Sequence, residues 1–357
     1  MKKYLLFLIS LLFINTIYSQ ELYSEDFNNF KLGNLGTDPD GLIAGQQGWF
    51  TYSIFSKDNS FFTIKKEVPL GNQSLVLSIP PGSSTAESIG VYKTNLNTLI
   101  DQRLPGNDVI KFEIEVFRGF LSKGEGYTEI KLFLNNELVE EHNGQGKIFL
   151  FNFNFKTSFL TTFDIQSIND NGVGNYHSSK TLSGNTWFKL IAYLDYVNGK
   201  IYFEIPELNL VVPLDFLKSI PSPSDNLIED FKPTMIGIRT DSRDIEINYF
   251  SQKYDNIKIT ALKEVPPEVI ALSTSEYLSN KFNLYPNPAT NVVNITNNEN
   301  MVVKQVMVYD ITGKLISTQF FNEQKEIQLN VENWASGTYL LHLQTNEGTA
   351  VKKLVKK

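Results

Sequence analysis

The chain has 357 residues, 41% of them hydrophobic, and a formal net charge of −7. This length and apolar content exclude a disordered chain and allow one large or two modest domains with buried cores. The acidic balance argues against nucleic acid as a partner. The sequence contains no cysteine, which excludes disulfides and thiol chemistry.

The first 19 residues have the features of a secretory signal peptide. Lys2 and Lys3 precede an apolar stretch over residues 4–14, and small or polar residues follow around Ser19. The apolar stretch is shorter than the ~18 residues that a spanning helix needs. We therefore expect cleavage between Ser19 and Gln20, and we expect no transmembrane segment in the mature chain.

The acidity belongs to the larger part of the chain. Loss of Lys2 and Lys3 with the signal peptide leaves a net charge of −9, of which residues 20–274 carry −10 and residues 275–357 carry +1. An acidic surface aids solubility and attracts cations or basic surfaces.

Residues 20–262 show the sequence pattern of β-strands. In VIKFEIEVF, residues 109–117, apolar residues alternate with Lys111, Glu113 and Glu115, which predicts one buried and one solvent-facing side. Similar runs recur between clusters of Gly, Asn, Asp and Pro, and YVNGK at 196–200 supplies the Asn-Gly that favours a tight hairpin turn. Many short strands joined by such turns predict an all-β fold with a large antiparallel β-sandwich.

A second, smaller domain is expected near the carboxyl terminus. Residues 263–280 contain adjacent prolines followed by small and polar residues, which indicates an inter-domain linker that is stiff at its start. Residues 281–357 again contain strand patterns, and Gly313 in the turn DITGK is placed to take a positive φ. A small Ig-like β-sandwich suits this length.

Four motifs in the second domain resemble a known family. They are YPNPAT at 285–290, VYDITGK at 308–314, GTYLLHL at 337–343 and the terminal VKKLVKK. Together they resemble the type A C-terminal sorting domain of the type IX secretion system. The residues of this sequence that carry the resemblance are Tyr285, Pro286, Asn287, Pro288, Asp310, Gly313, Lys314, Gly337, Tyr339, Lys352 and Lys353.

The resemblance implies that the second domain is a sorting signal. Its partner would be the type IX secretion machinery, which recognises such domains after passage through the inner membrane. The protein would then be secreted or attached to the outer cell surface of a Bacteroidetes-type bacterium. The motifs also suit a structural role, in which Tyr339 anchors a small core and the terminal lysines form a solvated strand end.

The large domain has a looser resemblance to laminin-G-like and concanavalin-A-like jelly rolls. It rests on the opening EDFNNFKLGNLGTDPDGLIAGQQGWF, the middle NTWFKLIAYLDYVNGKIYFEI and the closing FSQKYDNIKIT, within residues 21–262. The resemblance implies a jelly-roll fold that serves glycan binding, adhesion or polysaccharide cleavage. The fold alone does not choose among these functions.

Candidate catalytic residues are scarce. Hydrolysis of a glycosidic bond needs two carboxyl groups ~5–10 Å apart, and Glu113 and Glu115 lie on one face of a predicted strand. A solvated strand face explains the two residues better. A lyase would need a Tyr or His base beside an Arg or Asn, and no histidine stands in a recognisable motif.

Aromatic residues offer two candidates for a ligand site. Tyr176 and His177 lie in the predicted loop NDNGVGNYHSS and are placed to contact a ligand. The other aromatics are better explained as core residues or residues at the edge of the core. They are Phe149, Phe151, Phe153, Phe155, Trp49 and Trp187.

Calcium is the one metal that the composition allows, because only hard oxygen ligands are plentiful. Asp26 and Asp255 form the preferred pair, since the first and last strands of a jelly roll usually adjoin. Asp38 with Asp40, and Asp170, are further candidates. None completes a calcium-binding loop, so aspartates that serve turns remain the simpler explanation.

These observations leave three functions open for the large domain. The favoured one is a non-catalytic module that binds a glycan or another extracellular ligand. The first alternative is a polysaccharide hydrolase or lyase, and the second is a structural adhesin. Clustered carboxylates in a groove would favour the enzyme, exposed aromatics would favour glycan binding, and a face with neither would favour the adhesin.

Overall fold

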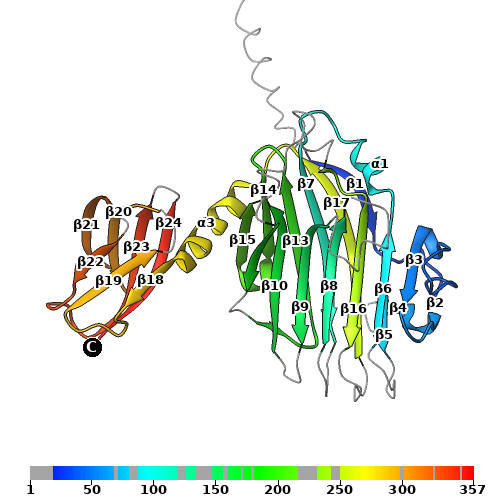
Figure 1. The fold of residues 1–357 in the computed structure, drawn as a ribbon, viewed down its shortest axis with the longest axis horizontal. Helices are drawn as coiled ribbons and strands as arrows, with labels where there is room; N and C mark the ends of the chain where they lie inside the picture. The colour runs from blue at the N-terminus through cyan, green and yellow to red at the C-terminus, as the bar shows by residue number, and fades with distance from the viewer. Residues whose placement is uncertain are drawn as a thin grey trace, which may run out of the picture.

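The computed structural model describes residues 19–67, 71–79, 87–119, 126–133, 147–155, 160–169, 172–177, 181–215, 231–242, 250–297, 301–324, 326–345 and 348–357. The predicted signal peptide therefore lies outside the described residues, except for Ser19. Figure 1 shows a large β domain and a small β domain on either side of the helix α3 (Pro267–Lys281).

Two antiparallel sheets form the large domain. Sheet A has the strand order β15-β14-β13-β7-β17-β5-β4-β2, with β1 also paired to β17, and sheet B has the order β11-β10-β9-β8-β16-β6-β3, with β12 also paired to β10. The strands of sheet A are β1 (Ser19–Glu25), β2 (Gly33–Asn34), β4 (Phe62–Lys66), β5 (Gln73–Ile79), β7 (Val109–Arg118), β13 (Thr186–Asp195), β14 (Lys200–Ile205), β15 (Leu210–Asp215) and β17 (Phe250–Leu262). Those of sheet B are β3 (Trp49–Ser53), β6 (Ser88–Lys93), β8 (Gly126–Phe133), β9 (Lys147–Phe155), β10 (Leu160–Asn169), β11 (Gly172–His177), β12 (Leu182–Ser183) and β16 (Met235–Ser242).

The core of the large domain lies between these sheets. In β7 the side chains of Phe112 and Ile114 are fully buried, whereas Glu113 and Glu115 on the opposite side are partly exposed. The same alternation places Trp49 and Phe151 in the core, where Phe151 stacks on Phe163. The predicted all-β fold with a large antiparallel sandwich is therefore confirmed.

Short helices cap the edges of the sandwich. Two of them bury apolar side chains at its rim, since Leu96 and Ile100 of α1 and Phe61 of η2 belong to the core. The short helices are α1 (Leu96–Ile100), η1 (Gln46–Gly48), η2 (Asn59–Phe61) and η4 (Pro206–Leu208).

The hairpin between β13 and β14 differs from the tight turn favoured by Asn-Gly. Asp195 pairs with Lys200, so the loop has the four residues 196–199, with Gly199 at φ 60°. The Asp195 carboxylate accepts hydrogen bonds from the backbone N–H groups of Val197 and Asn198 and from the Asn198 side chain. These three bonds stabilise the wider loop in place of a two-residue turn.

Much of the expected linker is helical. Helix α3 packs its Val269, together with the preceding Val265, on Tyr193, Tyr202 and Val211 of sheet A. Its other end contacts the small domain, where Leu278 joins the core. Among the described residues, no helix is both long and apolar enough to cross a membrane.

The small domain is a sandwich with its own core. One sheet has the order β18-β19-β22 and the other has the order β21-β20-β23-β24. Val293, Val306 and Leu341 are fully buried between them. The strands are β18 (Phe282–Tyr285), β19 (Val292–Asn297), β20 (Val303–Asp310), β21 (Leu315–Gln324), β22 (Ile327–Asn330), β23 (Gly337–Thr345) and β24 (Thr349–Lys356).

Candidate functional site

The outer face of sheet A holds Glu113 and Glu115, and both carboxylates contact lysines. Lys111 Nζ lies 3.0 Å from Glu113, and Lys189 Nζ lies 3.5 Å from Glu115. Asn256 Nδ2 also donates to Glu115 at 2.9 Å. The two carboxylates are therefore engaged in partly exposed polar contacts, the arrangement expected of a solvated sheet face.

Asp26 and Asp255 approach each other because β1 pairs with β17. Asp255 lies at a bulge of β17 opposite Glu115, and it is buried. Its carboxylate accepts hydrogen bonds from the Asn256 backbone N–H at 2.8 Å and from Asn72 Nδ2 at 3.2 Å. Burial, and then the charges of Glu115 and Asp26, raise the pKa of Asp255 to about 6.

The raised pKa of Asp255 predicts an unusual pH dependence for the metal-free protein. Folded Asp255 holds its proton up to about pH 6, whereas an unfolded aspartate releases it near ~pH 4. The folded state binds more protons between these values, so the free energy of unfolding should rise by ~1 kcal/mol as the pH falls from ~6.5 to ~4.5. Urea denaturation of the wild type and of Asp255→Asn at both pH values checks this difference. A wild type that gains no stability relative to the variant on acidification would contradict it.

Oxygen atoms of the kind that bind hard cations lie near Asp255. Asn72 Oδ1 is buried and has no hydrogen-bond partner among the described residues, while the Asn72 amide group contacts Asp255. Calcium accepts carboxylate and amide oxygens as ligands. No group of three acidic or histidine side chains suited to a metal ion occurs in the described part of the chain, so backbone oxygens or water would complete the shell.

The other aspartate candidates serve turns or surface contacts. The Asp38 carboxylate accepts hydrogen bonds from the backbone N–H groups of Asp40, Leu42 and Ile43. These bonds, first the one from Asp40, lower the pKa of Asp38. The Asp40 carboxylate lies 2.6 Å from Lys57 Nζ. Asp170 lies outside the described residues.

The predicted ligand residues Tyr176 and His177 are in β11, at one edge of sheet B. Tyr176 packs against the core of the large domain, so its ring faces inward. His177 occupies the register position opposite Asp164 of β10. The side chain of His177, like those of Phe149, Phe153 and Phe155, is outside the described part of the structure.

A row of polar residues crosses the outer face of sheet B. Cross-strand register aligns Arg239 of β16 with Glu129 of β8, Asn152 of β9 and Asp164 of β10. Alternate residues of these strands, such as Ile238 and Ile130, belong to the core. The row therefore lies on the side of the sheet opposite to the core.

The polar row and its neighbours form a connected network. Arg239 makes two contacts with Asp241, each of 2.9 Å, and its Nε also donates to Ser88 Oγ at 3.0 Å. Burial, and then a hydrogen bond with Asp241, raise the pKa of Tyr127 to about 12. Such a network fixes the orientation of planar polar groups.

The centre of the row also contains an unsatisfied oxygen. Lys131 Nζ contacts Glu129 at 2.5 Å, and both residues are buried. Asn152 pairs with Glu129 across β8 and β9, and its buried Oδ1 has no hydrogen-bond partner among the described residues. A ligand that donates a hydrogen bond would satisfy this oxygen.

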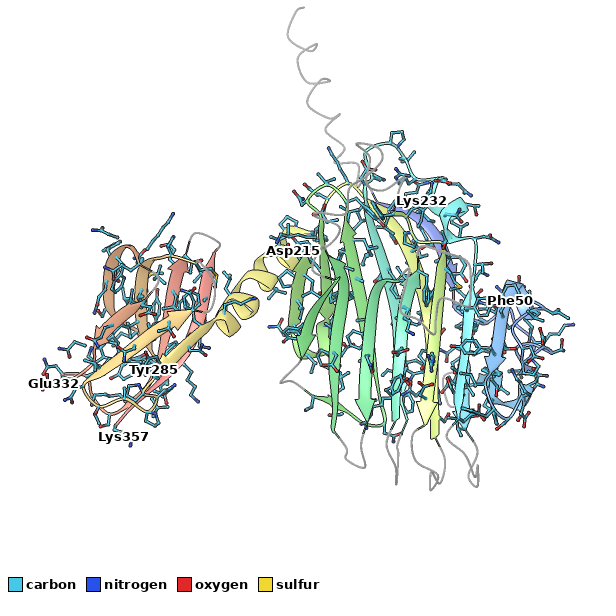
Figure 2. All side chains as sticks on the ribbon, in the orientation of Figure 1. Phe50, Asp215, Lys232, Tyr285, Glu332 and Lys357 are labelled. Carbon is cyan, nitrogen blue, oxygen red and sulfur yellow. The ribbon has the colours of Figure 1, made fainter. Side chains whose placement is uncertain are left out.

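Aromatic side chains lie beside the polar row. Phe50 of β3 stacks on Tyr92 with ring centroids 4.8 Å apart, and Figure 2 places Phe50 at that edge of the large domain. Tyr52 lies over Gly90, where an added Cβ would come within 2.4 Å of the Tyr52 ring. Phe133 packs in the same cluster. Trp187, by contrast, packs on Phe117 of sheet A with centroids 5.5 Å apart.

A separate cavity of about 420 Å³ lies between the β13–β14 hairpin and the start of α3. Val109, Val265 and Pro267 contribute its apolar wall, and Asp195 contributes a carboxylate. Because the Asp195 oxygens already accept the three turn hydrogen bonds described above, we assign no ligand to this cavity.

In the small domain, the motif YPNPAT meets the end of the chain. Asn287 Oδ1 accepts a hydrogen bond from the Val355 backbone N–H, and Asn287 Nδ2 donates to the Lys353 carbonyl, both at 2.9 Å. The Ala289 backbone N–H donates to the Val355 carbonyl at 2.8 Å. The peptide bonds before Pro286 and Pro288 are cis. Figure 2 shows Tyr285 and Lys357 toward the same end of the domain.

The motif VYDITGK forms the predicted hairpin turn. Asp310 Oδ1 accepts hydrogen bonds from Thr312 Oγ1 and from the backbone N–H groups of Thr312 and Lys314. These bonds, first that from the Thr312 hydroxyl, lower the pKa of Asp310. Gly313 adopts φ 83°, which confirms the positive φ expected from the sequence.

The remaining motif residues also make internal contacts. Tyr339 is buried, packs on Trp334 with centroids 5.0 Å apart, and donates its hydroxyl to the Ala335 carbonyl. Lys352 Nζ donates to the Ser279 carbonyl of α3, and burial lowers its pKa. The space beside Gly337 is open, since an added Cβ would meet nothing within 4 Å.

Comparison with protein families supports the reading of these motifs. Residues 283–357 match the family model described as a secretion system C-terminal sorting domain. The chain carries a C-terminal sorting domain. The protein is therefore exported to the cell surface or secreted, and the secretion machinery is its partner.

Comparisons for the whole chain are less specific. No curated protein matches the sequence. A solved structure of the CBM2 module of Lactobacillus casei BL23 phage J-1 evolved Dit is 12% identical, with a TM-score of 0.36, and the match covers 70% of this chain and 98% of that one. A glycoside hydrolase family 16 endo-glucanase from Bacteroides ovatus is 10% identical, with a TM-score of 0.41, and the match covers 67% and 99% of the two chains. At these scores the similarities carry no argument about the ligand of this chain.

The two hydrogen bonds of Asn287 predict a stability effect in the sorting domain. Asn287→Ala removes both and leaves the Val355 N–H and the Lys353 carbonyl without their partner. We expect the free energy of unfolding of this domain to fall by ~1–2 kcal/mol. Urea denaturation followed by the fluorescence of Trp334 measures this change. An unchanged midpoint would show that Asn287 does not hold the end of the chain.

Proposed function

We propose that the large domain is a non-catalytic glycan-binding module that the sorting domain delivers to the cell exterior. The observation that carries the proposal is the polar row on the outer face of sheet B, beside which the partly exposed Phe50 stacks on the buried Tyr92. Sugars are bound by planar polar groups that hydrogen-bond to hydroxyls and by aromatic rings that cover their apolar faces.

The ion pairs in this face favour binding over cleavage. Glu129 contacts Lys131, and Asp241 is held by Arg239 through two contacts. Hydrolysis of a glycosidic bond requires one carboxyl group as a proton donor and a second as a base or nucleophile. Two carboxylates that are each engaged with a cation are poorly suited to these roles.

Binding of the mature protein to a panel of polysaccharides, with analysis of soluble products, tests this function. We expect retention on at least one glycan and no release of shorter products. Product release would establish a hydrolase or lyase instead. Absence of binding to every glycan, with the protein folded and calcium present, would favour an adhesin that contacts other macromolecules.

We propose in addition that calcium binds beside Asp255 and stabilises the junction of β1 and β17. The support is the buried carboxylate, the nearby Asp26 charge and the unsatisfied Asn72 Oδ1. Calcium at a free concentration ~100 times its dissociation constant would add ~2.7 kcal/mol to the free energy of unfolding at neutral pH. Melting curves with calcium and with a chelator measure the effect, and Asp255→Asn should respond to neither. An unchanged wild-type curve after thorough metal removal would contradict the proposal.

A further inference from the structure

The sorting domain has one outer sheet face with several exposed apolar side chains. In the sheet β21-β20-β23-β24, Val306, Val308 and Leu341 point into the core. Cross-strand register aligns Leu315, Tyr309, Leu340 and Lys353 in one row across all four strands. We call the outer side of this sheet the apolar face. It carries the apolar residues Met307, Tyr309, Leu315, Phe320, Leu340, Val351 and Val355, and the polar residues Gln305, Thr318, Thr338, His342, Gln344, Thr349 and Lys353.

Several of these side chains are open to solvent. Phe320 is 78% exposed, Leu315 is 51% exposed and Leu340 is 36% exposed. Of the fourteen residues that define the apolar face, Lys353 alone carries a formal charge at neutral pH. Contiguous exposed apolar side chains of this kind mark interaction surfaces, and the centres of interfaces are rich in aromatic residues and Met and poor in charge.

The opposite outer face of the same domain has a different composition. In β18, β19 and β22, residues that alternate with the buried Phe282, Val293 and Leu329 are mostly amides. They include Asn283, Asn294, Gln328 and Asn330. Both outer faces of this small sandwich are exposed to solvent, and the second one is polar. Exposure to solvent therefore does not explain the apolar side chains of the first face.

Several motif residues use their side chains inside the domain, whereas Tyr285 is 55% exposed. Asn287, Asp310 and Tyr339 use their side chains in internal hydrogen bonds, and Lys352 donates to α3. These contacts hold the fold of the domain. A secretion partner that distinguishes this domain must therefore also contact other side chains, and the motifs themselves contribute Tyr309, Leu340 and Lys353 to the apolar face.

We propose that the apolar face is the docking surface for the secretion machinery. The partner surface would be apolar, with a carboxylate placed to meet Lys353, because an apolar patch with one peripheral cation is complementary to such a surface. The inference rests on the sorting domain and is independent of glycan binding by the large domain.

Export of the full chain from a bacterium that carries this secretion system tests the proposal. The variant Leu315→Thr, Phe320→Thr, Leu340→Thr removes the exposed apolar groups and keeps residues that favour strands. We expect the exported fraction to fall about tenfold or more, since a few central side chains carry most of the binding energy of an interface. The matched control is Asn283→Thr, Gln328→Thr on the amide face, which should be exported like the wild type.

Melting curves of both purified variants separate docking from stability. Unchanged melting with lost export supports the proposal, and normal export of the folded triple variant overturns it. Equal losses in the triple variant and in the amide-face control would also overturn it.

Lys353 supplies a second test that does not depend on how the triple variant folds. Lys353→Glu should lose export, whereas Lys353→Arg should retain it, because only the reversed charge opposes a carboxylate on the partner. Export of Lys353→Glu at the wild-type level would overturn the charge complementarity.

Sedimentation of the wild type tests whether a second copy of this chain occupies the apolar face instead. The wild type could be a dimer while the triple variant is a monomer that is exported normally. This result would assign the face to a second copy of this chain and overturn the proposal.

Discussion

A chain that lacks residues 283–357 is expected to remain in the periplasm with its large domain folded. The two domains have separate cores, so removal of the sorting domain leaves the core around Trp49 and Phe112 intact. The signal that the secretion machinery recognises is removed with these residues. Cell fractionation with an antibody to the large domain measures the distribution, and we expect nearly all of the truncated protein in the periplasmic fraction.

The folded state of the truncated protein must be measured beside its location. Resistance of the retained protein to limited proteolysis would show that it is folded and that export, rather than folding, has failed. The full chain expressed at the same level is the control. Efficient appearance of the folded truncated protein outside the cell would contradict the sorting role of this domain.

Phe112→Ala is expected to destabilise the large domain by about 3–5 kcal/mol. Phe112 is fully buried in β7, the strand between β13 and β17, and its register partners are Ala192 and Ile259. Removal of the ring leaves a cavity that the paired strands on both sides prevent from collapsing. Urea denaturation followed by tryptophan fluorescence should show an earlier transition for the large domain.

Glu113 supplies a matched control on the same strand. Its side chain points to the outer face of sheet A and pairs with Lys111 in a partly exposed contact. We expect Glu113→Gln to change the free energy of unfolding by less than ~0.5 kcal/mol. The transition of the small domain, which contains Trp334, should be the same in both variants. Equal destabilisation by the two substitutions would contradict the assignment of inner and outer faces.

Local sequence patterns predicted the strands and the sorting domain well. The alternation in residues 109–117 sets which side chains of β7 are buried, because a strand turns successive residues to opposite faces. Gly313 was identifiable from its turn because few other residues accept its positive φ. The pairing of β1 with β17 agrees with the expected proximity of Asp26 to Asp255.

Features that depend on tertiary contacts could not be predicted in the same way. Helix α3 begins at Pro267, the second of two adjacent prolines, and has weak amphipathic character, and its Val269 gains its role by packing on sheet A. The polar row of sheet B joins Arg239 to Glu129 and Asn152 through register between distant strands. The alternation in residues 126–133 and 235–242 contained part of this signal, since it places Glu129 and Arg239 on outward-facing positions.

Binding measured for variants of the two sheets tests the central claim of glycan binding most directly. With a glycan retained by the wild type, isothermal titration would compare Asn152→Ala and Tyr127→Phe on sheet B with Glu113→Gln on sheet A. We expect the dissociation constant to rise about tenfold for each sheet B variant, the loss of about one good hydrogen bond, and to stay unchanged for Glu113→Gln. Unchanged affinity in both sheet B variants, or weakening by Glu113→Gln alone, would contradict a binding site on the outer face of sheet B.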